Sequence, residues 1–423
     1  MRRNRSAPTL ARGSLRWIAC AILFVLWVGC AERERRNPFD PGNPETEGIP
    51  HVLDARAGDQ MVSLGWDLGS LKGIRRTRIS RRTFGGDAVG LTPNGLDPII
   101  HSFVDSTVLN NVDYEYRMEL ELPSGTVQPS AWDPATPGGV IPWVADGDGG
   151  GLARLTPDGR DLIGRVQDGL SVLDIAADTL EDAFWFVDYF GGGLYQHAAD
   201  GRLLRQCAVP GARAVAVDPD GSTIWVSSFS EQRLERRLRD GDLVWVDSTT
   251  VGHIDDLLAT GPGEVWMVNA EGEVRLWRGG SLTVRVSGFQ RPVALAPSTS
   301  GGVFVLDQDA ASVRLLGSTG KEERHTDSFL VAPTDLASDG SGGVWVADPG
   351  RGELVHFDEN LRETATTSQQ GVRGVMWDER DRHLWVAGEM GVRLLDSSGR
   401  LISGLSLGPR PLDVEVIHLR RRT

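Results

Sequence analysis

Lysine and cysteine are scarce in this chain of 423 residues, and long apolar segments are scarcer still. The only lysines are Lys72 and Lys321, although lysine and arginine together number 44. Acidic residues number 58, and the formal net charge of −14 argues against nucleic acid as a general partner. The lack of a second long apolar run excludes a polytopic membrane protein, and a hydrophobic content of 40% excludes a wholly disordered chain.

The first thirty residues have the pattern of an export signal. Residues 1–16 contain five arginines and no acid, and an apolar run then extends from Trp17 to Gly29. This run is too short to span a bilayer, for which about 20 residues are needed. With Cys30 directly after it, the segment resembles a bacterial lipoprotein signal. An uncleaved signal-anchor is the alternative.

The lipoprotein resemblance implies where the protein resides. Residues 1–29 would be removed, Cys30 would carry the lipid, and the protein would be anchored extracytoplasmically in the cell envelope, with Ala31 favouring the outer membrane. Residues 30–49 are charged and contain several prolines, which is typical of a flexible tether. Because Cys30 is acylated in this interpretation, Cys207 is left without a partner and no intrachain disulfide is expected.

Residues 50–133 contain strand patterns at roughly ten-residue intervals, separated by turn residues. The clearest alternation occurs in Met61–Trp66 and in residues 112–122. Trp66 in the second strand and Tyr114 in the sixth make the segment similar to a fibronectin type III domain, a small Ig-like sandwich. The resemblance implies that both residues belong to the core, that the Tyr114 hydroxyl bonds back to the backbone, and that the domain is a spacer or adhesive module.

A motif built around a large aromatic residue recurs about every 40 residues in the rest of the chain. This period, with four short strands in each repeat, is the signature of propeller blades. We expect the aromatic side chains to pack between adjacent blades rather than to form a cofactor site, and no cofactor is predicted. The seven residues are Trp143, Trp185, Trp225, Trp266, Phe304, Trp345 and Trp385.

The repeats can be closed into a ring. Six of them have a first strand ahead of the aromatic motif, whereas the first repeat has a Pro/Gly linker there and a matching strand follows the last repeat at residues 411–418. We therefore predict an all-β protein, with the sandwich followed by a seven-bladed propeller over residues 139–423 that is closed by its C-terminal strand. The repeats resemble the NHL and streptogramin-lyase-like propellers, a resemblance that specifies fold better than function.

Acidic residues follow the aromatic motif in several repeats. Asp146 and Asp148 resemble the start of a calcium loop, but Pro157 stands where the acidic ligand about 12 residues along is expected. We therefore expect these acids to cap turns, and predict no metal site. The histidines do not share a position in the repeats, so their spacing gives no metal-binding trio.

One position at the start of the repeats is enriched in cationic side chains. The residue just before the first strand is usually arginine, and all such residues would lie at one end of the propeller, around the mouth of its axial channel. Guanidinium groups bind carboxylates and phosphates through forked hydrogen bonds, so we predict an anion-binding mouth. The alternative is that each cation pairs with a nearby acid. The predicted site contains Arg213, His253, Arg291, Arg373 and Arg410.

The leading functional hypothesis is non-catalytic binding or scaffolding through the propeller loops, with a protein, a glycan or a small anionic molecule as the ligand. The resemblance to lyase-like and lactonase-like propellers implies the alternative of an enzyme with its site at the channel mouth. Convergence of His253, His356 and nearby carboxylates would favour the enzyme. A purely architectural envelope component is the third hypothesis.

Overall fold

The computed structural model describes residues 39, 43, 48–50, 52–68, 73–83, 85–147, 150–167, 169–178, 180–248, 251–326, 330–407 and 411–418. The predicted signal peptide, Cys30, most of the tether, Asp148 and Arg410 lie outside these residues. Every regular element in the described part is a β-strand, so the prediction of an all-β protein is confirmed. No helix in this part is long and apolar enough to cross a membrane.

The chain divides into two compact units. The first comprises residues 1–54, 65–101 and 115–133, and the second comprises residues 55–64, 102–114 and 134–423. The segment predicted to be one sandwich, residues 50–133, is therefore shared between the two units.

Two small sheets contain the strands that precede residue 136. One has the order β1-β2-β5, with β1 at Leu53–Gly58, β2 at Met61–Trp66 and β5 at Ser102–Asp105. The other has the order β4-β3-β6-β7, and β8 also pairs with β6. Its strands are β3 (Arg76–Thr83), β4 (Val89–Gly90), β6 (Tyr114–Glu121), β7 (Val127–Pro129) and β8 (Asp133–Ala135).

The predicted core residues of this N-terminal segment are buried. Trp66 and Tyr114 are each 7% exposed, and burial alternates along the whole of β6. The Tyr114 hydroxyl accepts a hydrogen bond of 3.2 Å from the backbone N–H of Leu109. The expected contact of this hydroxyl with the backbone is therefore present.

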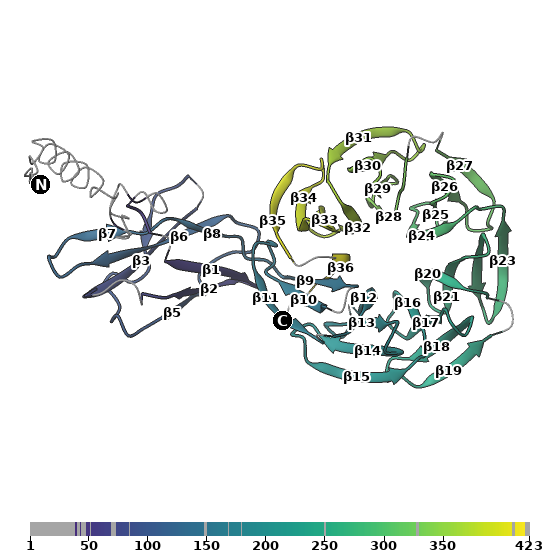
Figure 1. The fold of residues 1–423 in the computed structure, drawn as a ribbon, viewed down its shortest axis with the longest axis horizontal. Coiled ribbons are helices and arrows are strands. Elements are labelled where there is room, and N and C mark those ends of the chain that lie inside the picture. The colour runs from purple at the N-terminus through teal and green to yellow at the C-terminus, as the bar shows by residue number, and fades with distance from the viewer. Residues whose placement is uncertain are drawn as a thin grey trace, which may run out of the picture. The chain divides into compact units, whose positions relative to one another are not determined.

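From residue 140 onward, the described chain forms seven four-stranded antiparallel sheets, which follow one another around a ring (Figure 1). The inner strands are β12 (Val172–Asp178), β16 (Ala212–Val217), β20 (Ile254–Gly261), β24 (Pro292–Pro297), β28 (Asp335–Ser338), β32 (Val372–Asp378) and β36 (Pro411–His418). The second strands are β9 (Val140–Asp146), β13 (Ala183–Asp188), β17 (Thr223–Ser228), β21 (Glu264–Asn269), β25 (Val303–Asp307), β29 (Val344–Asp348) and β33 (His383–Gly388).

The third and outer strands complete each sheet. The third strands are β10 (Gly151–Leu155), β14 (Gly193–Ala198), β18 (Arg233–Leu238), β22 (Glu273–Arg278), β26 (Ser312–Leu316), β30 (Glu353–Phe357) and β34 (Gly391–Asp396). The outer strands are β11 (Leu162–Val166), β15 (Leu203–Ala208), β19 (Leu243–Asp247), β23 (Ser281–Ser287), β27 (Glu322–His325), β31 (Glu363–Ser368) and β35 (Leu401–Leu405).

The C-terminal strand closes the ring. β36 pairs antiparallel with β9, so that Val414 lies opposite Val144 and Glu415 lies opposite Trp143. β36 also contacts the inner strands β32 and β12, which belong to the last and the second sheets of the ring. The predicted pairing of residues 411–418 with the first repeat is therefore confirmed.

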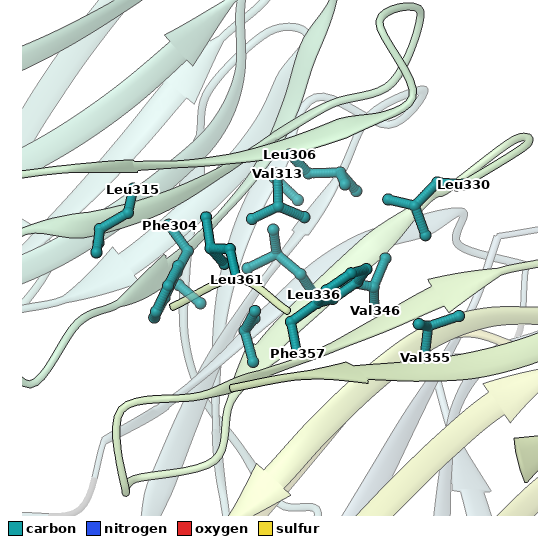
Figure 2. Close-up of a cluster of buried hydrophobic side chains, with 13 residues drawn as sticks. Phe304, Leu306, Val313, Leu315, Leu330, Leu336, Val346, Val355, Phe357 and Leu361 are labelled. Atoms are coloured by element: carbon teal, nitrogen blue, oxygen red, sulfur yellow. The ribbon is translucent and has the colours of Figure 1, made fainter. Parts of the chain in front are cut away.

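The recurring aromatic residues lie between sheets. Each of them is at most 2% exposed and belongs to a separate apolar cluster that joins its own sheet to the next. Figure 2 shows one such cluster, in which Phe304 of β25 packs with Val346 of β29 and Phe357 of β30. Burial of a side chain of this size stabilises the fold by roughly 2–3 kcal/mol on an area basis.

Glycines in the turns between third and outer strands allow the close approach of these tryptophans. Gly201 has a φ of +93°, and a Cβ atom at this position would lie 3.0 Å from the Trp143 ring. Gly399 has a φ of +83°, and a Cβ atom added there would lie 3.2 Å from the Trp345 ring. Only glycine combines this backbone conformation with the space that the ring requires.

Candidate functional site

The loop face is the end of the ring at which second strands turn into third strands and outer strands lead into the next inner strand. Arg213 and Arg373 are the second residues of β16 and β32, and His253 and Arg291 immediately precede β20 and β24. The four described members of the predicted anion site therefore lie at the same end of their sheets.

Three of these four side chains are already paired with acids. Arg213 lies 3.0 Å from Asp255, and Arg373 lies 2.8 Å from Glu389. Nδ1 of His253 lies 2.6 Å from Oε1 of Glu271. At these three residues the structure therefore shows local pairing, the alternative to an anion-binding mouth, with acids of nearby strands and turns as the partners.

Arg291 is the exception, because its side chain forms no ion pair with any described residue. Its charge acts on Asp255, the carboxylate that Arg213 already contacts. Burial raises the pKa of Asp255, and the charge of Arg213 offsets part of that rise. The Arg213 guanidinium also lies 5.6 Å from the centre of the Phe229 ring, so it is held by an aromatic side chain as well as by an acid.

Apolar side chains project from three connections of the loop face. Phe190, in the turn between β13 and β14, is 82% exposed, and Met390, in the turn between β33 and β34, is 56% exposed. Val331, in the connection from β27 to β28, is 63% exposed. Tyr189 packs edge-on against Phe190, with 5.3 Å between the ring centres. Large apolar side chains at exposed turns are suitable anchors for a partner.

His253 and His356, whose convergence would favour an enzyme, lie apart. His253 lies on the loop face. His356 belongs to β30, and its Nε2 lies 2.9 Å from Asp339, a residue of the turn between β28 and β29 at the opposite end of the sheet. Nε2 of His253 lies 3.0 Å from the side-chain amide of Gln232. With Glu271 on one ring nitrogen and Gln232 on the other, the imidazole of His253 is held in place by two partners.

A set of carboxylates on the inner strands was missed by the sequence reasoning. Asp174, Asp256, Asp335 and Asp413 occupy the same place on β12, β20, β28 and β36, and each is followed by a β-branched residue or leucine. In each case the carboxylate accepts a bond of 2.7–2.8 Å from the backbone N–H of the next residue. The recurring Asp-Ile, Asp-Leu or Asp-Val pair was the available signal.

These carboxylates bind protons more tightly than free aspartate does. Burial raises the pKa of Asp174 to about 7 and that of Asp335 to about 6, and it raises the pKa of Asp256 and Asp413 well above the usual value. Burial also raises the pKa of Glu415 to about 8. The inner strands therefore concentrate acids whose proton affinity is raised by burial.

Aspartates at the ends of second strands bond to neighbouring groups of the loop face. Asp146 lies 3.6 Å from Arg165. Asp348 accepts bonds of 2.8 and 3.0 Å from the backbone N–H groups of Val331 and Ala332, and so fixes the backbone at these two residues. Among the described residues, no group of three or more His, Cys, Asp or Glu side chains is arranged to hold a metal ion.

Comparison with known proteins identifies the fold. No protein-family model and no curated protein matches the sequence. Among solved structures, a functionally unknown protein from Desulfotomaculum acetoxidans DSM 771 is similar with a TM-score of 0.56 and 11% identity, over 66% of this chain and 99% of the other.

Two lyase structures are also similar. A streptogramin B lyase has a TM-score of 0.51 and 12% identity, over 58% of this chain and 85% of the other. A catalytically inactive histidine-to-alanine variant of virginiamycin B lyase from Staphylococcus aureus, with quinupristin, has a TM-score of 0.52 and 12% identity, over 58% of this chain and 87% of the other. These likenesses, together with the repeated four-stranded sheets, show that the chain contains a β-propeller.

Proposed function

We propose that this protein is a lipid-anchored component of the bacterial cell envelope that binds a partner through the loop face without catalysing a reaction. In this proposal Cys30 carries the lipid, and residues 50–133 form a fibronectin type III-like spacer. The seven four-stranded sheets are the blades of a closed, NHL-like propeller.

The observation that carries the binding function is the exposure of Phe190, Val331 and Met390 on one face. Their exposed fractions lie between 56% and 82%. A single exposed apolar side chain is common on protein surfaces, but three on the connections of one face point to contact with a partner. Because Asp348 bonds to the backbone of Val331, and short turns carry Phe190 and Met390, these three side chains are held in place before binding.

The charge of the face indicates the chemistry of the partner. Arg213, His253 and Arg373 are each paired with an acid, so the described loop face does not present a concentrated positive field. The apolar anchors and paired charges suit a partner that offers both apolar and hydrogen-bonding groups. A protein surface meets this requirement better than a small anion does.

Photo-crosslinking in intact cells tests this proposal. A photoreactive residue placed at position 190 or 390 should give a discrete adduct of higher mass, because these side chains would contact the partner. Position 180 is the matched control, since Leu180 is also partly exposed but lies in the turn between β12 and β13, at the opposite end. A Val331→Asp substitution should reduce the adduct severalfold. The absence of an adduct at 190 and 390, or an equal adduct at 180, would contradict the proposal.

One observation favours a second candidate function, a propeller-type lyase or lactonase. The 2.6 Å contact between His253 and Glu271 pairs an imidazole with a carboxylate on the loop face, and such a pair is suited to general acid–base catalysis. Purified protein should then open the lactone ring of quinupristin or of a simple lactone, and His253→Ala should abolish this activity. A lack of turnover, detected by mass spectrometry of the substrate, counts against this second function.

A further inference from the structure

Aspartate occupies one inner-strand position in alternate sheets around the ring. In each sheet, the recurring aromatic residue of the second strand lies opposite one residue of the inner strand. The position in question is two residues before that inner-strand residue. Where aspartate is absent, the residue is alanine or glycine. In ring order the position holds Asp174, Ala214, Asp256, Ala294, Asp335, Gly374 and Asp413.

Asp174, Asp256 and Asp335 are each followed in the ring by a sheet with alanine or glycine at this position. Each of the three joins its own sheet to that next sheet. One oxygen of its carboxylate bonds to its own strand, and the other accepts a backbone N–H from the inner strand of the next sheet. These second bonds are 2.7 Å from Val215 to Asp174, 2.7 Å from Leu295 to Asp256, and 2.8 Å from Val375 to Asp335.

An odd number of sheets prevents strict alternation, and the pattern fails at the closure. The sheet that follows β36 in the ring begins with β12, which carries an aspartate of its own. The N–H of Ile175, equivalent to those used in the other sheets, is already bonded to Asp174 at 2.8 Å. The second carboxylate oxygen of Asp413 therefore has no hydrogen bond to a described residue, and the negative charge of Asp174 acts strongly on Asp413.

The closing strand carries one more acid at a position where the other sheets have none. Glu415 lies opposite Trp143, whereas the residues opposite the other aromatic side chains are Ala176, Ala216, Leu258, Ala296, Ala337 and Met376. Three carboxylates, those of Asp174, Asp413 and Glu415, therefore belong to the two inner strands β12 and β36, which contact each other.

We propose that the contact between β36 and β12 is a pH-dependent latch, which holds the propeller closed in mildly acidic solution and loosens as the pH rises through neutrality. When these carboxylates are protonated they do not repel one another, and each can donate a hydrogen bond. When they are ionised, their like charges repel at the contact between β36 and β12, where Asp413 accepts no hydrogen bond from the described part of β12.

The other charges around β36 do not cancel this effect. Arg213 acts on Asp174 and lowers its proton affinity, but it is itself paired with Asp255. Asp335 raises the proton affinity of Asp413, and Asp378 raises that of Glu415. The remaining titratable side chains on the strands packed against β36 are His383 and the paired groups Asp146 with Arg165, Asp178 with Arg239, Arg373 with Glu389, and Asp378 with His418.

The direction follows from proton linkage. Burial raises the pKa of Asp174 to about 7, that of Glu415 to about 8, and that of Asp413 well above its usual value. Because the folded state binds these protons more tightly than the unfolded state, their stabilising contribution is complete below pH ~4 and falls as the pH rises to about 8.

Hydrogen exchange in the full-length protein at pH 5 and pH 8 tests the latch. Protection factors correct for the pH dependence of intrinsic exchange, and the third strand β26, which is not an inner strand, serves as an internal reference. We expect the protection of β36 relative to β26 to fall by at least ~tenfold between pH 5 and pH 8, since one unit of pKa shift corresponds to a tenfold change. Equal protection ratios at the two pH values would overturn the proposal.

Two charge-neutralising variants isolate the carboxylates responsible. Asp413→Asn keeps the acceptor for Val414 and removes the charge, so it should raise the protection of β36 at pH 8 and flatten its pH dependence; Glu415→Gln should act in the same direction. Asp309→Asn removes one charge at an exposed turn position and should leave the wild-type dependence intact. Asp413→Asn with a wild-type pH dependence would also overturn the proposal.

Discussion

The indole Nε1–H of Trp225 donates a hydrogen bond of 2.8 Å to Oδ1 of Asp218, and both side chains are fully buried. Trp185 occupies the equivalent place in the preceding sheet, but its Nε1–H has no hydrogen-bond partner among the described residues. Two tryptophans in the same structural role therefore differ in one hydrogen bond, which makes them a matched pair for mutagenesis.

Trp225→Phe should destabilise the protein more than Trp185→Phe does. Both substitutions remove similar volume, but only the first leaves the buried Asp218 carboxylate without one of its donors. The expected difference in the free energy of unfolding is about 1–3 kcal/mol. Urea denaturation monitored by circular dichroism measures it, and equal losses in the two variants would show that the hydrogen bond contributes little.

The aspartates that bond to the backbone of the next inner strand, here called clamps, give a second prediction. Asp256→Ala removes the acceptor for the backbone N–H groups of Leu257 and Leu295, which leaves both without that partner. We expect a loss of about 1–3 kcal/mol in the free energy of unfolding at pH 5. Asp309→Ala, at an exposed turn, should change the stability by less than about 0.5 kcal/mol. Chemical denaturation of both variants provides the test, and similar midpoints would argue against a structural role for the clamp.

Gly201→Ala should be more costly than Gly288→Ala. The two glycines have nearly the same φ, +93° and +97°, but an added Cβ would meet the Trp143 ring at 3.0 Å only at position 201, while nothing lies within 4 Å at position 288. The backbone strain is therefore similar, and the difference reports the contacts with Trp143 and, at 3.2 Å, with Val166. We expect about 1–3 kcal/mol of additional destabilisation from overpacking, measured by thermal or chemical unfolding. A difference near zero would mean that the turn moves freely.

Stability should also fall at strongly acidic pH, through a different group. Burial acts to raise the pKa of Asp339, but hydrogen bonds from His356 and from Ser341 and the Gly343 backbone outweigh it and lower this pKa to about 2. Because the folded pKa is depressed, the stabilising contribution is present above pH ~4 and is lost as the pH falls toward 2. Asp339→Asn should reduce this loss by about 1–2 kcal/mol, after allowance for partial exposure. If the free energy of unfolding of the variant falls at acidic pH as much as that of the wild type, this assignment is wrong.

The repeating architecture was predictable because the second strand of each sheet is buried on both faces. A Trp or Phe at that position recurs at nearly constant spacing, as Trp225 and Trp266 illustrate, and it locates each sheet along the chain. The closing strand was also predictable, since the first repeat lacks an inner strand and residues 411–418 supply one. Local patterns of this kind survive in sequence because they depend on burial alone.

The charges of the loop face were not predictable in the same way. The spacing placed Arg213 and Arg373 at one end of their sheets, but the acids that pair with them, Asp255 and Glu389, come from different strands and turns. Whether a cation is free or neutralised depends on side-chain proximity across strands. The alternation of aspartate with alanine or glycine was visible in principle, yet its period spans two repeats.

The strand pairing of Pro411–His418 with Val140–Asp146 also has a consequence for biosynthesis. The sheet that is begun first cannot be finished until residues 411–418 have been translated, so almost the entire repeat array must wait as an incomplete assembly during synthesis. A stop codon or proteolytic cut before residue 411 would leave β9 with an unoccupied hydrogen-bonding edge, and truncated copies would then be open to strand exchange with one another.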